Sequence, residues 1–332
     1  MSLIRFIKEW TLPVAIVVGT SLYLLFAFVP QLAGAASVLG PMVDTVFPLS
    51  VFATLLVTFT KVDFHLMHLC RWHGVVLAAQ LVLIGSTVAL LIWPEKMGVS
   101  DAGQLFRLRS VMLAILTCVI APCASASPVV TAKLGGNLTA MTTFVLLSSL
   151  VGAVLLPAVF AFVNPQADVQ FVAAFLTILR KMSVVLLLPL CLGAVIHIGG
   201  RHRVRGFTNI YDYIIRTPDL GFYCWAFSLA ITAGVTVRGI VHSGASFRLL
   251  MAVAMGSCGM SWLQWSIGRA IGNHLGAPIE SGQAMFQKNT ALTIFMASLY
   301  LPPIAAVGAG CYVLWQNIIN SIELWQHQSK NS

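Results

Sequence analysis

Apolar runs of about 20 residues, the length that an α-helix needs to cross the hydrocarbon core of a bilayer, recur along the whole of this chain. Of its 332 residues, 58% are hydrophobic and only 9% are charged. A soluble domain of this composition would lack the polar residues needed to cover its surface. A membrane β-barrel would alternate polar and apolar residues in short segments, which this sequence does not do. The sequence therefore predicts an all-α polytopic membrane protein embedded in a lipid bilayer.

Ten spans are predicted, five in each half of the chain. The expected boundaries are about 11–29, 41–60, 74–93, 110–134 and 137–163 in the first half, and about 182–199, 218–240, 247–270, 279–300 and 303–325 in the second. The stretches at about 61–73 and 168–181 are expected to be amphipathic and interfacial, and residues 326–332 to form a disordered tail. An odd number of spans per half predicts that the second repeat, residues 164–325, is inverted relative to the first, residues 1–163.

The net charge of +9 comes from basic residues in the predicted loops, where they set the orientation of a membrane protein and do not indicate nucleic-acid binding. If both termini are cytoplasmic, 11 lysine and arginine residues lie inside, 7 lie outside and Lys288 remains in the membrane. We therefore expect a multi-pass protein of the cell membrane, specifically a bacterial inner membrane, with both termini cytoplasmic. The seven cysteines lie mostly in apolar runs, which predicts buried thiols and no disulfide framework.

Two of the ten spans have a polar or helix-breaking centre. The span at 110–134 contains Ala-Pro-Cys-Ala-Ser-Ala-Ser-Pro at residues 121–128, and the span at 279–300 contains Gln-Lys-Asn at residues 287–289. Each is the fourth span of its half. Interrupted helices at matching positions of inverted repeats are the recognised pointer to a transport site. The alternative is two kinked packing helices whose polar residues bond to a neighbouring helix.

Lys288 is the residue most difficult to place in a membrane helix. A lysine at the centre of a bilayer costs roughly 3 kcal/mol even on lenient insertion scales, so it should face protein or a water-filled cavity. Only a large shift of the span would let its side chain reach the interface. Glu280, Ala284 and Lys288 recur at the spacing of one helical face. Glu280 also suits a helix cap, and Pro128 is expected to break its helix.

The residues expected to bind substrate or ions lie in and around these two breaks. From the sequence pattern alone they are Ser127, Pro128, Thr131, Glu280, Gln283, Gln287, Lys288 and Asn289. No serine–histidine–acid set, phosphate loop or zinc helix motif is present, so we expect neither an enzyme nor a cofactor. Three histidines and a cysteine cluster at residues 65–73, but their irregular spacing argues against a metal site.

Several short motifs, spread in order over most of the chain, resemble the bile acid:sodium symporter superfamily. They are Val62-Asp-Phe64, Gln80, Pro122–Ser127 with Thr131, Gly136-Asn137, and Gln287-Lys-Asn-Thr-Ala-Leu292. The resemblance implies two inverted five-helix repeats, with discontinuous helices four and nine crossing. It also implies a core of spans 3–5 and 8–10 and a panel of spans 1–2 and 6–7. It adds Gln80, Asn137 and Thr290 to the expected binding residues.

Three positions depart from the family pattern. Pro128 stands at the family's crossing asparagine, Ala284 at its sodium-binding glutamate and Lys288 at a sodium-site glutamine. Two unit positive charges about 4 Å apart repel by about 4 kcal/mol at an effective dielectric constant of about 20. The usual sodium sites are therefore expected to be dismantled. The Lys288 ammonium would then neutralise the substrate in place of one sodium ion.

The resemblance and its departures imply a secondary active transporter that moves a small organic anion by alternating access, as a monomer or weak dimer. Transport would be sodium-independent, proton-coupled or weakly sodium-coupled. Proton coupling would have Lys288 lose its proton in a dry state, because burial disfavours the charged form. The alternatives are a sodium-coupled anion symporter, an arsenite-efflux permease using Cys123, and a transporter-like membrane sensor.

Overall fold

A computed structural model of the chain describes residues 10–62, 67–96, 101–163, 172–173, 176, 180, 187–217 and 219–331. Most of the stretch predicted to be interfacial at 168–181 lies outside these described residues, as do Asp63, Phe64 and His65. Within the described ranges every regular element is a helix, which confirms the predicted helical class.

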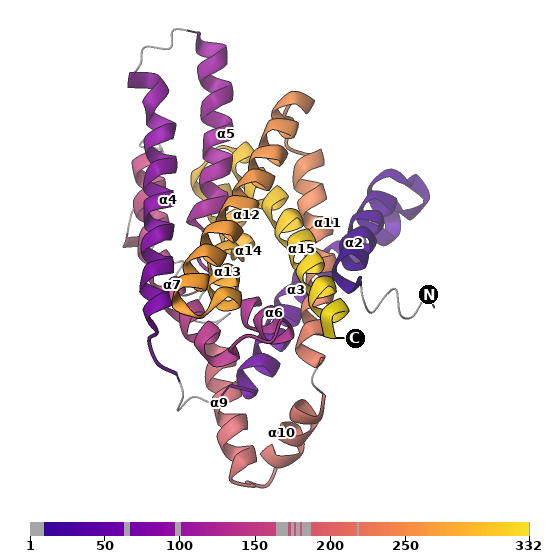
Figure 1. The fold of residues 1–332 in the computed structure, drawn as a ribbon. Coiled ribbons are helices and arrows are strands. Elements are labelled where there is room, and N and C mark those ends of the chain that lie inside the picture. Colours follow the sequence, from indigo (N-terminus) through magenta and orange to yellow (C-terminus); the bar gives the residue numbers. More distant parts are fainter. Residues whose placement is uncertain are drawn as a thin grey trace.

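Figure 1 shows the order of the helices along the described parts of the chain. In the first half they are α2 (Thr11–Phe28), the 3-10 turn η1 (Pro30–Leu32), α3 (Ala33–Thr60), α4 (Arg71–Lys96), α5 (Ala102–Ile120), α6 (Ser127–Lys133) and α7 (Leu138–Val163). In the second half they are α9 (Leu188–Arg201), α10 (Phe207–Arg216), α11 (Leu220–Val241), α12 (Phe247–Leu275), α13 (Pro278–Phe286), α14 (Thr290–Tyr300) and α15 (Pro303–Asn331).

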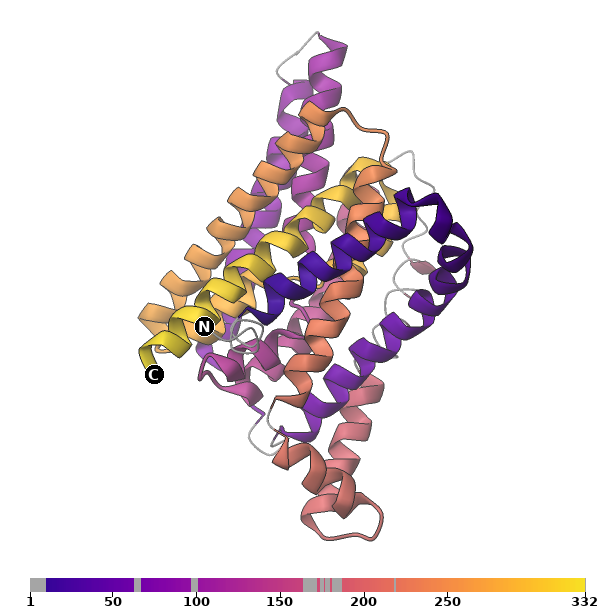
Figure 2. The same ribbon diagram turned by 90° about the vertical axis from the view of Figure 1, so that its right-hand side faces the viewer.

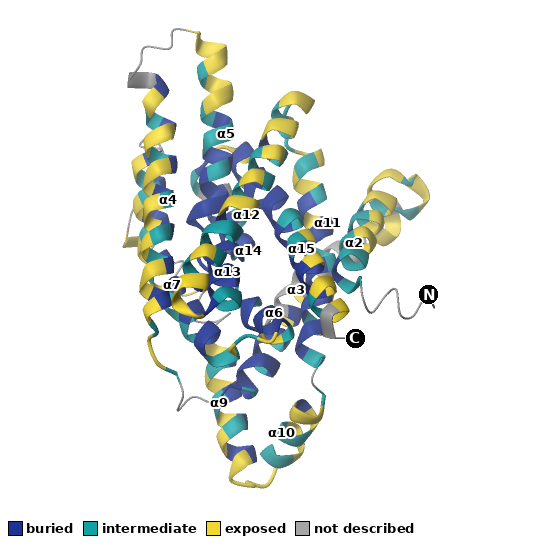
Figure 3. Cartoon of the chain, in the orientation of Figure 1, coloured by how far each residue is buried: buried dark blue, intermediate teal, exposed yellow. Residues whose placement is uncertain are grey.

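Among the described helices, α2, α4, α5, α7 and α11 are long and apolar enough to cross a membrane by themselves. The surface of the bundle carries many exposed apolar side chains, including Val82 (69% exposed) and Leu150 (62%) (Figure 3). Water would not favour such a surface, whereas lipid does. The chain is a multi-pass helical membrane protein. α13 and α14 are each too short to span a bilayer because a break divides their segment.

Several parts of the helical layout differ from the sequence prediction, and α3 begins at Ala33 instead of about residue 41. α5 begins earlier than expected because the Asp101 carboxylate accepts hydrogen bonds from the N–H groups of Gly103 and Gln104. The basic segment after α9 was expected to be a loop but contains the amphipathic helix α10. The predicted disordered tail was also wrong. α15 continues to Asn331, and its Trp325 ring lies 6.2 Å from that of Trp10 at the start of α2.

The helices pack in two groups. α2, α3 and α11 contact one another, and α9 packs on α3. In the other group, α12 packs on α5, α13 and α15, while α4 lies against α5 and α6 lies against α7. The two groups meet where α2 and α11 contact α15 and where α11 contacts α6 (Figure 2). A buried apolar cluster including Leu116, Leu156 and Met296 holds the second group together.

α5 and α15 approach each other closely at a glycine. A Cβ atom placed on Gly308 would overlap the backbone of Ala114, whereas a Cβ on the exposed Gly259 of α12 would meet nothing within 4 Å. Small residues at such crossings allow helix backbones in membranes to approach.

We therefore expect Gly308→Ala to destabilise the protein by about 1–3 kcal/mol, because backbone atoms cannot move aside as a flexible side chain can. The matched variant Gly259→Ala should be neutral or stabilise by up to about 1 kcal/mol. Thermal unfolding of the purified protein in detergent measures both. Equal effects of the two variants would show that the α5–α15 contact is not as close as described.

Candidate functional site at two helix breaks

The first break separates α5 from α6. α5 ends at Ile120, and Ala121 has an extended backbone (ψ 134°), as expected for the residue preceding a proline. α6 then starts at Ser127, with Pro128 in its first turn. A proline is well tolerated there, because the N–H groups of a first turn have no partner within the helix. The break is confirmed, but it was assigned to the wrong proline: Pro122 follows the end of α5, and Pro128 helps to start α6.

The second break separates α13 from α14 without any proline or glycine. α13 ends at Phe286, and Gln287 has an extended backbone (φ −77°, ψ 107°). The side-chain oxygen of Asn289 then accepts a hydrogen bond from the N–H of Leu292 at 3.2 Å, which caps the start of α14. The break predicted from polarity alone is thus confirmed. The expected face of Glu280, Ala284 and Lys288 is wrong, because Lys288 lies beyond the end of α13.

The two breaks pair with each other through an isolated antiparallel β-bridge. The N–H of Ala124 donates to the carbonyl of Gln287 at 2.9 Å, and the N–H of Asn289 donates to the carbonyl of Pro122 at 2.8 Å. Cys123 and Lys288 lie opposite each other between these bonds. Each interrupted helix therefore supplies hydrogen-bond partners for the backbone that the other leaves exposed.

Side chains from three further helices satisfy most of the remaining backbone groups. Gln80 of α4 donates to the carbonyl of Ala121 at 3.1 Å, and Ser148 of α7 accepts from the N–H of Cys123 at 2.6 Å. In α15, the Tyr312 hydroxyl donates to the Phe286 carbonyl at 2.7 Å, and Gln316 accepts from the N–H of Lys288 at 3.0 Å. Unpaired backbone groups are costly in a membrane interior, so these side chains stabilise the breaks.

Lys288 is enclosed by this arrangement. Its side chain is only 1% exposed, and Nζ has no hydrogen-bond partner among the described residues. Burying an ammonium group without an opposite charge is strongly unfavourable. The position therefore calls for a negatively charged or hydrogen-bonding ligand, or for water.

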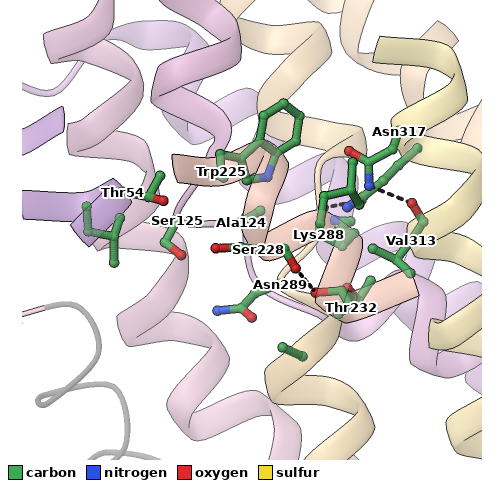
Figure 4. A pocket seen from close by; sticks show the side chains of 16 residues that line it. Thr54, Ala124, Ser125, Trp225, Ser228, Thr232, Lys288, Asn289, Val313 and Asn317 are labelled. Carbon is green, nitrogen blue, oxygen red and sulfur yellow. Dashed lines mark hydrogen bonds between the residues drawn. The ribbon is translucent and has the colours of Figure 1, made fainter. Parts of the chain in front are cut away.

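A cavity of about 100 Å³ lies beside Lys288 (Figure 4). Its walls come from both breaks and from α3, α11 and α15, and Lys288 is the only charged residue among the described residues that line it. Hydroxyl and amide groups supply most of the other polar surface. The lining residues are Thr54, Leu55, Ala124, Ser125, Ala126, Trp225, Ser228, Leu229, Thr232, Lys288, Asn289, Thr290, Ala291, Val313, Gln316 and Asn317.

The structure brings some of the predicted site residues to this cavity and leaves others away from it. Lys288, Asn289 and Thr290 line it. The others lie behind the breaks or at the helix starts and do not line it: Gln80, Ser127, Pro128, Thr131, Asn137, Glu280, Gln283 and Gln287. Most of them are buried polar residues close to the two paired breaks.

Glu280 and Asn137 act together as a cap. The Glu280 carboxylate accepts a hydrogen bond from the Asn137 N–H at 2.6 Å, and the Asn137 side-chain oxygen accepts from Ala140 at 2.9 Å at the start of α7. A carboxylate near a helix N-terminus is favourable. Glu280 thus caps a helix start, but that helix is α7 and not its own helix α13, whose start was expected.

Sequence reasoning missed a polar face on α15. Gln316, Asn320 and Glu323 recur at the i, i+4, i+7 spacing of one helical face, and Asn317 lies beside them. All four are buried. That spacing within the last span was the signal that could have revealed them.

At its far end this polar face meets α12 and α13. Glu323 forms an ion pair with Arg269 and accepts hydrogen bonds from Trp265 at 2.9 Å and Gln283 at 2.7 Å. Gln283 is therefore part of a polar cluster that joins three helices of the second group. It does not contact the cavity.

The Tyr312 hydroxyl provides a direct test of how the breaks are stabilised. Tyr312→Phe should destabilise the protein by about 1–3 kcal/mol, because it leaves the Phe286 carbonyl buried without a partner. Tyr213→Phe removes an exposed hydroxyl from α10 and should change stability by less than about 0.5 kcal/mol. Thermal unfolding in detergent compares the two. A neutral Tyr312→Phe would mean that the hydroxyl does not hold the end of α13.

Comparison with known families agrees with this geometry. Residues 48–242, more than half of the chain, match the Sodium Bile acid symporter family. The matched region includes the first break and ends before α12, so it does not extend to Lys288. A search of curated proteins found no match. The chain belongs to the sodium bile acid symporter family, whose members are transporters and not enzymes.

Proposed function

We propose that this protein is a secondary active transporter of a small organic anion, and that the Lys288 ammonium binds the anionic group of the substrate. The observation that carries this proposal is the buried, unpartnered Nζ of Lys288 at the edge of a polar cavity. An anion would supply the opposite charge that the described residues do not provide. Charge-assisted hydrogen bonds of this kind are among the strongest that proteins make.

The cavity favours a small substrate. Its volume of about 100 Å³ is below the roughly 300–1,000 Å³ of pockets that hold drug-sized ligands. The hydroxyl groups of Thr54, Ser228 and Thr232 donate to backbone carbonyls of their own helices, so their oxygens can accept hydrogen bonds from a polar group of the substrate. Trp225 offers an apolar wall. A carboxylate with a few carbon atoms fits this combination of charge, polarity and size.

The residues at the family's usual sodium positions do not suit a sodium ion. Ala284 is fully buried among apolar side chains and offers no side-chain oxygen, and Pro128 offers none either. Lys288 adds a positive charge. These features support transport that is sodium-independent, proton-coupled or weakly sodium-coupled. The proposed transporter uses no cofactor.

The packing suggests which parts move. In the proposed alternating-access cycle, a panel of α2, α3, α9 and α11 moves relative to a core that holds both breaks. The cavity lies between residues of the two groups, which supports this division. The proposal includes ten spans in two inverted repeats with crossing spans four and nine, both termini cytoplasmic in a bacterial inner membrane, and a monomer or weak dimer.

A second candidate is a sodium-coupled symporter of an organic anion. The family match favours it. The side-chain oxygen of Gln80 also favours it, because this atom is buried without a partner while the amide nitrogen holds Ala121. Under this alternative Gln80 would contribute to a remaining cation site.

Lys288→Gln keeps a polar side chain but removes the charge. In proteoliposomes the variant should take up radiolabelled pyruvate, a small carboxylate, with an apparent affinity roughly 10- to 100-fold weaker, as expected for losing about 1.5–3 kcal/mol of charge-assisted bonding. Arg238→Gln removes an exposed positive charge and is the control. Unchanged affinity and uptake in Lys288→Gln would make the lysine a bystander.

The coupling ion can be tested separately. Because the sodium-site residues are replaced, exchanging sodium for choline should leave initial uptake of pyruvate by the wild-type protein essentially unchanged. The measurement is uptake by proteoliposomes at matched ionic strength. Uptake that depends strictly on sodium would contradict the proposed coupling and favour the symporter alternative.

A further inference from the structure

A second cavity, of about 310 Å³, shares two helices, α3 and α11, with the first. Its lining comes from α3, α6 and α11, with Leu138 of α7 and Ile215 of α10. Among the described residues that line it, two lysines, Lys61 and Lys133, and one aspartate, Asp219, are charged. These described side chains carry one net positive charge, the same sign as the charge that Lys288 brings to the first cavity.

The two cavities follow each other along α3 and along α11. On α3 the lining passes from Thr54 in the first cavity to Thr58 and then Lys61 at the second. At the helical rise of about 1.5 Å per residue, Lys61 lies about 10 Å along the axis from Thr54. On α11 the lining passes from Trp225 to Asp219. A small molecule leaving the Lys288 cavity toward α10 would therefore meet this second group of charges.

The charged groups of the second cavity interact with one another. Lys133, at the end of α6, forms an ion pair with Asp219, and its ammonium also lies 4.8 Å from the centre of the Phe222 ring. Lys61 Nζ donates to the Thr217 carbonyl at 3.0 Å. Burial lowers the pKa of Lys61, the Asp219 carboxylate raises it and the Lys133 ammonium lowers it, so the three groups act on each other.

Asp219 occupies the N-cap position of α11 but does not cap the helix. Aspartate is one of the best residues for this role, yet its carboxylate is turned toward Lys133 instead. The pair is partly open to solvent, with 28% of the lysine side chain and 45% of the aspartate side chain exposed. Exposed pairs are weak, so another carboxylate can displace Asp219 at low cost.

We propose that Lys61 and Lys133 form a second binding site for small carboxylates, in which the ligand replaces Asp219 on Lys133 and Asp219 turns to cap α11. This rests on the proposed function, since the site would receive the same anions as the Lys288 cavity. One carboxylate is exchanged for another, so the charge balance at Lys133 is kept. The exchange also releases the tie between α6 in the core and α11 in the panel.

A cysteine reporter can measure occupancy of this site without relying on transport. Thr58→Cys places a thiol in the second cavity of the full-length protein in detergent. Pyruvate should slow its reaction with N-ethylmaleimide, relative to the parent protein, whereas the neutral analogue pyruvamide should not. Lys133→Gln should abolish protection. Asp219→Asn should lower the half-protecting pyruvate concentration about two- to fivefold, because the lysine no longer has a competing carboxylate.

In a binding site, Lys133→Gln and Asp219→Asn should change protection by pyruvate in opposite directions, which a structural ion pair would not do. If Lys133→Gln and Asp219→Asn weaken protection equally and the double variant restores it, the pair is structural and the proposal fails. It also fails if pyruvate and pyruvamide protect alike or pyruvate gives no protection at Thr58→Cys.

A reporter in the first cavity keeps this result distinct from the proposed function. Thr54→Cys reports on the cavity beside Lys288. Lys288→Gln should abolish pyruvate protection at Thr54→Cys and leave it intact at Thr58→Cys. If Lys288→Gln changes neither reporter while Lys133→Gln still removes protection at Thr58→Cys, the role of Lys288 is contradicted and the second site stands.

Discussion

Two backbone hydrogen bonds between extended segments hold the centre of this protein together. They join the break after α5 to the break after α13, through Ala124 with Gln287 and Asn289 with Pro122. A broken helix in a membrane interior exposes N–H and C=O groups that lipid cannot satisfy. Pairing the two breaks provides hydrogen-bond partners for some of these backbone groups in each break. Side chains of α4, α7 and α15 provide partners for others. These contacts explain why the neighbouring helices carry buried polar residues next to the paired breaks.

The paired breaks also determine where the charged side chain of Lys288 lies. Lys288 lies in the extended segment after α13. Its backbone N–H donates a hydrogen bond to Gln316, and its side chain lies beside the cavity. Lys288 Nζ has no acidic partner among the described residues. In the proposed cycle, an arriving anion would balance the ammonium, so binding energy would be concentrated on the charged end of the substrate. Movement of the two helix groups would then expose the same contact to either side of the membrane.

The sequence was informative about the elements and less so about their contacts. Long apolar runs predicted the helices, and the polar residues at 287–289 predicted a break that no proline marks. The first break was also predicted, but its cause was assigned to Pro128, because the sequence does not show which of two prolines ends α5. The bond between Glu280 and Asn137 joins residues 143 positions apart, and no local pattern encodes such a contact. The polar face of α15 did have a local signal, in the spacing of Gln316, Asn320 and Glu323.

The central claim is that the Lys288 ammonium directly contacts the anionic group of the substrate. The most direct measurement is solid-state NMR of the protein in bilayers, with isotope labels on the lysine side-chain nitrogen and on the carboxylate carbon of pyruvate. A charge-assisted contact predicts a dipolar coupling that corresponds to about 3–4 Å, assigned to Lys288 by its loss in the Lys288→Gln variant. A coupling that persists unchanged in that variant, or no coupling to bound pyruvate in the wild type, would contradict the claim.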